Sequence, residues 1–406
     1  MTGRRVRMTA RATDEPHRVS SQLELLFDLT FVIAIASLTA RFAHALADGQ
    51  ALDELVPFLQ VFFAVWWAWI NFTWFASSFD TDDVPYRLLT LVQMGGVLVI
   101  AAAVPAALEH GEFGAVALGY VIMRLGLVAQ WLRVAADDPA SRGLALRSAI
   151  GITIAQAAWV LWLGIPEAGS LPFFAALVVL ELAIPRWAER GAPSSWHPHH
   201  IAERYGLFAI ILLGESVFAA STGVDRALEA GGVSAPLVAV AVSALALVFA
   251  LWWLYFLQPA GEGLASHRDR SYLWGYGHYG IFAALAAVGA GLEVAVEQAG
   301  HDVAASPVAV GYAIAVPVSV FLVLLWALHA PIVDRQVCRP TPMLGGGLVI
   351  LLLPLAEPWI GLSAVVGAIA VACAAIVAIT IRAEARHSGR TRADRPRSRT
   401  RRMASA

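Results

Sequence analysis

The chain has 406 residues, of which 59% are hydrophobic and only 14% are charged, and its mean hydropathy is +0.68. Soluble proteins are roughly 45–50% apolar and about 25% charged, so this composition excludes a water-soluble globule and predicts an integral membrane protein. The formal net charge is -2, and all 28 basic residues are Arg because the sequence contains no Lys. The lack of Lys excludes a retinal or pyridoxal Schiff base and a Walker A phosphate site.

Apolar runs define the expected helices. A membrane-spanning helix needs about 20 apolar residues, and polar or Gly/Pro-containing breaks separate about twelve runs of this kind. We expect helices at 23–46, 53–78, 86–108, 113–135, 142–164, 170–188, 201–222, 234–257, 271–296, 306–329, 342–357 and 360–381. Pro354 and Pro358 are expected to break a helix or mark a tight turn. The predicted fold class is therefore an all-α, polytopic membrane protein.

The Arg residues predict the orientation. With twelve spans, every Arg except Arg41, Arg124 and Arg226 falls on the side that carries both termini. Basic residues are retained in the cytoplasm, so we expect both termini on the cytoplasmic side of a bacterial inner membrane. Residues 1–22 lack a cleavable hydrophobic signal and form a tail. Residues 383–406 form a basic, disordered tail that rests on anionic lipid, and no nucleic-acid partner is expected.

The two halves of the chain resemble each other. The matched positions are Glu24 with Glu203, Trp66-Trp67 with Trp252-Trp253, and GYVI at Gly119 with GYAI at Gly311. Six spans in each half keep both repeats in the same orientation. We therefore expect six-helix halves at 23–190 and 191–382, with a site where they meet. Chance similarity between apolar segments is the alternative.

A polar cluster is predicted near the cytoplasmic ends of the spans, formed by Glu24, Asp28, His200, Glu203, Arg204 and His278. Glu24 and Asp28 lie one helical turn apart, and two such carboxylates do not both ionise easily without a nearby cation. They indicate a proton or cation site, or alternatively a helix start whose free N–H groups they cap. Histidine is the residue type that titrates near neutrality, although a packed, hydrogen-bonded histidine explains His278 equally well.

Three ionisable residues lie deeper in the predicted spans: Arg124, Glu181 and Glu215. A charge in hydrocarbon costs at least about 2.5–3.5 kcal/mol, and Arg does not deprotonate, so Arg124 needs a carboxylate or an anionic ligand. We expect Arg124 beside Glu215 and Glu181, which would leave one protonatable carboxylate. The alternative is a static ion pair that fixes the register of two helices.

No metal or cofactor is expected. His197, His199, His200 and Glu203 are closely spaced, but the sequence has no H-E-x-x-H motif and no Cys/His framework. The two cysteines form no C-x-x-C motif and are expected to be packing residues. The Trp clusters are typical of helix packing or an interfacial belt rather than a cofactor cage.

Two segments, LELLFDLTFVIAI and HHIAERYGLFAIILLGES, resemble the bacterial low-temperature-requirement A (LtrA) family. The second segment is the more specific, because it combines E-R-Y-G and L-G-E-S in one helix. The resemblance covers about residues 18–382 and leaves the Arg-rich tail outside. It implies a multi-spanning bacterial membrane protein associated with growth in the cold, without an established molecular activity. It assigns no role to the motif positions Glu24, Asp28, His200, Glu203, Arg204, Gly214 and Glu215.

Three functions stay open. A secondary transporter of a small solute, in one version proton-coupled, is favoured by the repeat and the deep carboxylates. The loop SSFDTDDVPYR lacks the Gly-rich basic signature of the major facilitator superfamily, so that fold is not assumed. A membrane sensor or accessory protein would act through a protein partner or lipid. An integral membrane enzyme acting on a lipid head group is less expected, because no nucleophile or metal motif is present.

Overall fold

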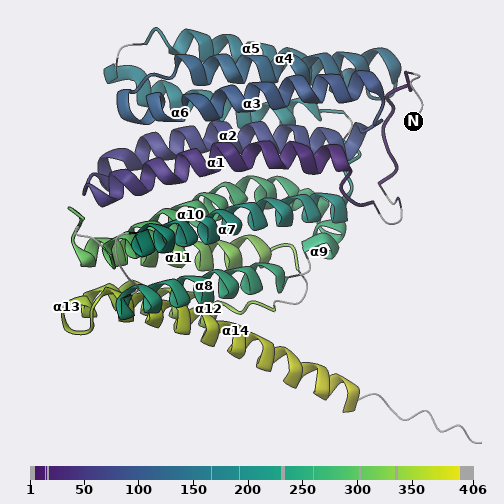
Figure 1. Cartoon of the computed structure of the whole chain (residues 1–406). Coiled ribbons are helices and arrows are strands. Elements are labelled where there is room, and N and C mark those ends of the chain that lie inside the picture. Colours follow the sequence, from purple (N-terminus) through teal and green to yellow (C-terminus); the bar gives the residue numbers. More distant parts are fainter. Residues whose placement is uncertain are drawn as a thin grey trace, which may run out of the picture.

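The fold is known from a computed structural model that describes residues 5–13, 15, 18–165, 167–191, 193–229, 234–258, 260–300, 303–333 and 337–393. These residues form a bundle of helices and contain no strand (Figure 1). The all-α class predicted from the sequence is confirmed.

The first half of the chain contributes six long helices, α1 (Gln22–Ala47), α2 (Ala51–Phe79), α3 (Val84–His110), α4 (Gly114–Asp137), α5 (Arg142–Trp162) and α6 (Glu167–Ala188). Local signals set their ends. The Ser21 hydroxyl accepts the Glu24 N–H and so caps the start of α1. At the end of α3, Gly111 adopts φ 66°, the left-handed conformation that glycine tolerates best.

The second half is less regular. It contains α7 (Pro198–Glu229), α8 (Ala235–Phe256), α9 (Ala260–Ser266), the 3-10 helix η1 (Arg268–Arg270), α10 (Ser271–Gln298), α11 (Pro307–His329), α12 (Pro340–Leu352), the 3-10 helix η2 (Leu353–Ala356), α13 (Glu357–Ile360) and α14 (Leu362–Ala393). Pro354 and Pro358 lie in η2 and α13, where the long helix breaks as expected. The short α9 and η1 were not predicted, because their sequence lacks an apolar run.

Helix α14 differs most from its predicted bounds. It continues to Ala393, into the segment that the sequence predicts as a disordered tail. Residues 394–406, which make up most of the predicted disordered tail, lie outside the described residues.

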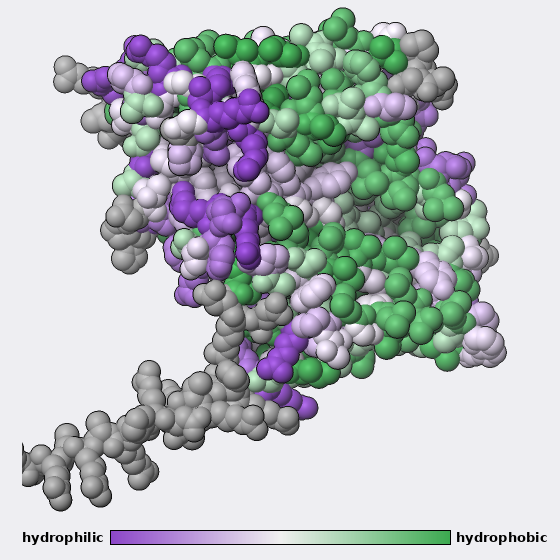
Figure 2. Space-filling view, turned by 180° about the vertical axis from the view of Figure 1, so that it is seen from behind, coloured by the Kyte–Doolittle hydropathy of each residue, from purple (hydrophilic) through white to green (hydrophobic). Residues whose placement is uncertain are grey.

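Eleven segments are long and apolar enough to cross a membrane. The twelfth predicted span corresponds to α7, a 32-residue helix that packs against α1, α8 and α10. Exposed apolar side chains cover the sides of the bundle, while hydrophilic residues gather at one end (Figure 2). This distribution is what a lipid bilayer around the bundle requires.

The two halves stack against each other, and their helices pack in a similar order (Figure 1). Helix α1 contacts α2 and α3, α3 contacts α4, and α4 contacts α5; in the second half α7 contacts α8 and α10, α10 contacts α11, and α11 contacts α12. The halves meet where α1 and α2 face α7 and α10. The shared order supports the two predicted six-helix halves, which stay a prediction.

The N-terminal residues and the C-terminal part of α14 lie at the same end of the bundle, together with α9 (Figure 1). We call this the basic end, and the end that carries α13 the opposite end. A common side for both termini agrees with an even number of spans. That the basic end faces the cytoplasm stays a prediction.

The N-terminal residues do not extend freely from the basic end. The Val6 and Met8 N–H groups bond to the carboxylates of Asp83 and Asp137 at 2.8 and 3.2 Å. The Arg11 N–H donates to the Ser78 carbonyl at 2.9 Å. This N-terminal segment therefore ties together the ends of α2, α3 and α4.

Helices α3 and α4 approach each other unusually closely at two glycines. A Cβ on Gly96 would lie 2.5 Å from the Gly119 carbonyl oxygen, and a Cβ on Gly119 would lie 2.6 Å from the Gly96 carbonyl oxygen. Only glycine fits both positions without moving the helices.

Candidate functional site

Helices α1 and α7 bring four charged side chains together inside the bundle. Arg204 Nη2 lies 2.7 Å from Asp28 Oδ1. One turn nearer the basic end, His200 Nε2 lies 3.1 Å from Glu24 Oε1, an ion pair when the imidazole is protonated. The four side chains are at most 4% exposed. We call them the buried cluster, and the sequence predicted all four as parts of one polar site.

The spacing of these residues explains the geometry. Glu24 and Asp28 are four residues apart on α1, and His200 and Arg204 are four residues apart on α7. Residues at this spacing lie on one helix face, so the two facing helices form two ion pairs in successive turns. The Glu24 carboxylate also accepts the Ser21 N–H at 2.7 Å. It therefore caps the helix and pairs across the interface, combining both interpretations of the sequence.

Helix α2 supplies two further contacts that sequence analysis missed. Trp69 Nε1 donates to Asp28 Oδ1 at 2.8 Å, and Thr73 Oγ1 lies 3.5 Å from Arg204 Nη2. Neither residue is ionisable or part of a motif, so the sequence held no signal for them.

Glu203 and His278 belong to the surroundings of the buried cluster. Glu203 is half-buried and accepts the Ser20 N–H at 3.3 Å. His278 is fully buried, its Nδ1 lies 2.7 Å from the Trp274 carbonyl oxygen, and its ring packs edge-on against Tyr205. This contact set favours the packed, hydrogen-bonded histidine.

Several polar atoms in and beside the buried cluster have no hydrogen-bond partner within the protein. They are Asp28 Oδ2, His200 Nδ1, Arg204 Nε and Nη1, and the Tyr86 hydroxyl. Buried polar groups are nearly always bonded to protein or ordered water, so these atoms are suited to bind water molecules or a proton. The arrangement can hold a mobile proton among two carboxylates and an imidazole.

Charged groups outside the spans border the buried cluster at the basic end. Burial, followed by the nearby charge of Glu24, raises the pKa of Asp80 to about 6. Burial lowers the pKa of Arg18, whose Nη2 donates to the Ala76 carbonyl at 3.0 Å. The sequence did not single out these two residues, because loop and tail charges ordinarily face water.

The second predicted site is reduced to a pair. Arg124 Nη2 lies 3.2 Å from the Glu181 carboxylate, which also accepts the indole N–H groups of Trp67 and Trp159 at 2.8 and 3.1 Å. Glu215 is buried on α7, and no ion pair of it is recorded among the described residues. The fully bonded Glu181 fits the static ion pair of the two alternatives.

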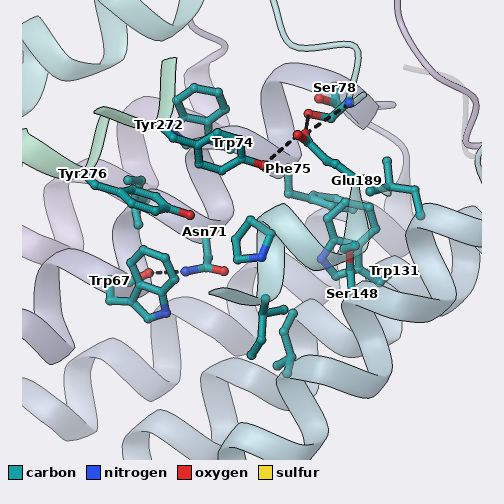
Figure 3. Close-up of a pocket in the computed structure, with 17 residues that line it drawn as sticks. Trp67, Asn71, Trp74, Phe75, Ser78, Trp131, Ser148, Glu189, Tyr272 and Tyr276 are labelled. Atoms are coloured by element: carbon teal, nitrogen blue, oxygen red, sulfur yellow. Dashed lines mark hydrogen bonds between the residues drawn. The ribbon is translucent and has the colours of Figure 1, made fainter. Parts of the chain in front are cut away.

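A cavity opens between the halves near the basic end (Figure 3). We call it the aromatic cavity, and it is lined by Trp67, Ile70, Asn71, Trp74, Phe75, Ser78, Trp131, Leu144, Ser148, Ile152, Ile184, Pro185, Ala188, Glu189, Ser194, Tyr272 and Tyr276. A water-sized molecule can occupy about 80 Å³ of it. The Glu189 carboxylate accepts the Tyr272 hydroxyl at 2.6 Å and also the Ser194 hydroxyl.

A second cavity lies between α2, α6 and α10 toward the opposite end. We call it the apolar cavity, and it is lined by Val56, Leu59, Gln60, Phe63, Trp66, Leu171, Phe174, Val178, Leu182, Tyr276 and Tyr279. It measures about 310 Å³. Both cavities border α2, α6 and α10, and Tyr276 lines both. Sequence analysis found neither, because a cavity depends on how distant helices pack.

Comparison with known proteins identifies relatives of the whole helical region. The family model described as "Bacterial low temperature requirement A protein (LtrA)" matches residues 19–380, which include the buried cluster and the lining of both cavities. An uncharacterized protein of Rhizobium meliloti is 32% identical over 275 residues, which cover 64% of this chain and 65% of that relative. No solved structure matches the chain.

Proposed function

We propose that this chain, which belongs to the bacterial low temperature requirement A family, is a secondary transporter of a small solute. The proposed path runs between α2, α6 and α10. The Lys-free sequence has no Walker A site that could drive primary transport. By the positive-inside rule, we propose that the basic end and both termini lie on the cytoplasmic side of the inner membrane.

The observation that carries the proposal is the pair of cavities along one line of helices. The aromatic cavity reaches Ser78 and Ser194 near the basic end, and the apolar cavity reaches Val56 and Leu171 near the opposite end. Trp66, Trp67 and Tyr276 lie between them. Small movements of these rings would open the path toward one end at a time, as alternating access between two halves requires.

The buried cluster supports the proton-coupled version of this function. Helix α2 touches the buried cluster through Trp69 and Thr73, and it lines the path through Trp67, Asn71 and Trp74. A proton that weakens the Asp28–Arg204 pair would therefore act on the helix that borders the solute. The buried cluster is also enclosed by protein, which suits proton binding better than entry of a lipid head group.

Cysteine accessibility tests the path without knowledge of the solute. In a background with Cys338→Ala and Cys373→Ala, we expect a membrane-impermeant maleimide to label Ser148→Cys from the basic end and Gln60→Cys from the opposite end. Asn71→Cys, beside the Trp67 carbonyl at 2.7 Å, should be labelled from both sides in oriented vesicles. Ile154→Cys is the unreactive control, because Ile154 is 56% exposed on the side of α5 that faces lipid. Labelling of Asn71→Cys from one side alone contradicts alternating access.

A further inference from the structure

The aromatic cavity has the chemistry of a site for cations. Six of its lining side chains are aromatic, namely Trp67, Trp74, Phe75, Trp131, Tyr272 and Tyr276. The faces of such rings carry negative potential and attract cations that lie within about 6 Å of them. None of the described lining residues is basic, and the single charged one is the carboxylate of Glu189.

The Glu189 carboxyl group is held in place by hydrogen bonds. The Tyr272 hydroxyl donates to one carboxylate oxygen at 2.6 Å, and the Ser194 N–H donates to the other at 3.1 Å. These two bonds fix the direction of the carboxyl group. Arg186 Cζ lies over the Tyr272 ring, 5.7 Å from the ring centroid, but Arg186 does not line the cavity. A cation already occupies one aromatic face beside the cavity.

The lining favours an organic cation over a metal ion. Hard cations such as Ca²⁺ take six to eight oxygen ligands, whereas this cavity is lined by six aromatic rings and a single carboxylate (Figure 3). The space of about 80 Å³ exceeds what one or two water molecules need. It suits an ammonium group with small alkyl substituents, whose charge is spread over an apolar surface.

Aromatic contacts continue from this cavity toward the opposite end. Ring centroids lie 5.4 Å apart for Tyr272 and Tyr276, 5.5 Å for Tyr276 and Trp67, 5.5 Å for Trp67 and Trp66, and 5.3 Å for Trp66 and Tyr279. Tyr279 already borders the apolar cavity. A cation that leaves Glu189 thus meets a succession of ring faces instead of bare hydrocarbon.

We propose that the aromatic cavity binds a small organic ammonium ion, with Glu189 neutralising its charge and the surrounding rings contacting its alkyl groups. This inference deepens the proposed function by naming its substrate class, and it rests on that function for the step after binding. Binding itself is an equilibrium property that is measured separately.

The test is equilibrium dialysis of radiolabelled tetramethylammonium against the full-length protein in lipid nanodiscs at constant ionic strength. We expect saturable binding that excess unlabelled tetramethylammonium displaces. The neutral isostere tert-butanol and Na⁺ should not displace it. Absence of saturable binding, or displacement by tert-butanol, would overturn the inference.

Matched variants locate the site. Glu189→Gln should weaken binding about tenfold, and Trp131→Leu about threefold or more. Trp131→Phe keeps an aromatic face and should retain most of the affinity, which separates ring loss from misfolding. Glu262→Gln and the lipid-facing Trp252→Leu, both exposed residues, should leave binding unchanged. Equal losses in Trp131→Phe and Trp131→Leu, or an unaffected Glu189→Gln, contradict the assignment.

The two proposals fail in different ways. If tetramethylammonium does not bind while Asn71→Cys is labelled from both sides, the path stands and the substrate class is wrong. If it binds with the expected variant pattern while Asn71→Cys is labelled from one side alone, the cavity is a cation site without a transport path.

Discussion

Asp28 and Arg204 form a deeply buried ion pair between the two halves, with side chains 4% and 0% exposed. Each would be very unfavourable alone, because an unpaired buried charge loses its hydration without compensation. Removing one partner is therefore expected to lower the stability by more than the ion pair itself contributes, because the other charge would stay buried and unpaired. This distinction can be measured.

We expect Arg204→Met to lower the free energy of unfolding by about 3–5 kcal/mol, because it leaves the Asp28 carboxylate unpaired. The double variant with Asp28→Asn should recover more than half of this loss. Denaturant unfolding in detergent micelles checks both values. Arg41→Gln, which breaks the half-exposed pair with Glu109, is the control and should cost less than about 1 kcal/mol. Additive losses in the double variant would contradict this account.

Asp80 gives a prediction of pH dependence. Its pKa is raised from 3.8 to about 6 in the fold, first by burial and next by the charge of Glu24. A raised carboxyl pKa contributes stability below pH 4 that is lost as the pH rises through 6. Asp80→Asn mimics the protonated form, so it should be more stable than wild type by about 2–3 kcal/mol at pH 8 and equal to it near pH 4.

Unfolding measured across this pH range checks the Asp80 prediction. A constant difference between Asp80→Asn and wild type at all pH values would mean that titration of Asp80 does not contribute.

At the scale of helices, the α3–α4 contact at Gly96 and Gly119 leaves no room for a side chain. Gly96→Ala should push the helices apart and lower the free energy of unfolding by about 1–3 kcal/mol or more. Gly95→Ala is a close control, since a Cβ there meets nothing within 4 Å. It should be neutral or slightly stabilising, because it restricts the unfolded chain. Thermal unfolding of the two variants side by side decides the point.

The positions of the helices could be predicted from the sequence far better than the contacts between them. Length and hydropathy are local properties, so the spans and the break at Pro354 followed from them. Depth in the membrane is also local, and it grouped Arg124 with Glu181, whose side chains lie 3.2 Å apart. Glu215 has a similar depth but lies on α7 in the other half, because depth fixes position along the membrane normal and not beside it. Trp69 carries no charge, and only the structure shows that its indole N–H donates to Asp28.

At the scale of the whole molecule, the buried cluster joins the two halves, because each half supplies one partner of each pair. Residues 1–190 contain Glu24 and Asp28, and residues 191–406 contain His200 and Arg204. We expect the two segments, expressed together as separate chains, to co-purify from membranes. Arg204→Met in the second segment should reduce the yield of the complex severalfold. Exposed Arg270→Met is the control, and equal yields from both variants would contradict a role for the buried pairs in assembly.

The same pairs impose an order on biosynthesis. Arg204 follows Asp28 by 176 positions, so α1 is made and reaches the membrane long before its cationic partners exist. During that interval its two carboxylates must either take up protons or remain at the water boundary. If they remain at the water boundary, complete insertion of α1 waits for α7, and a helix made early reaches its final depth late.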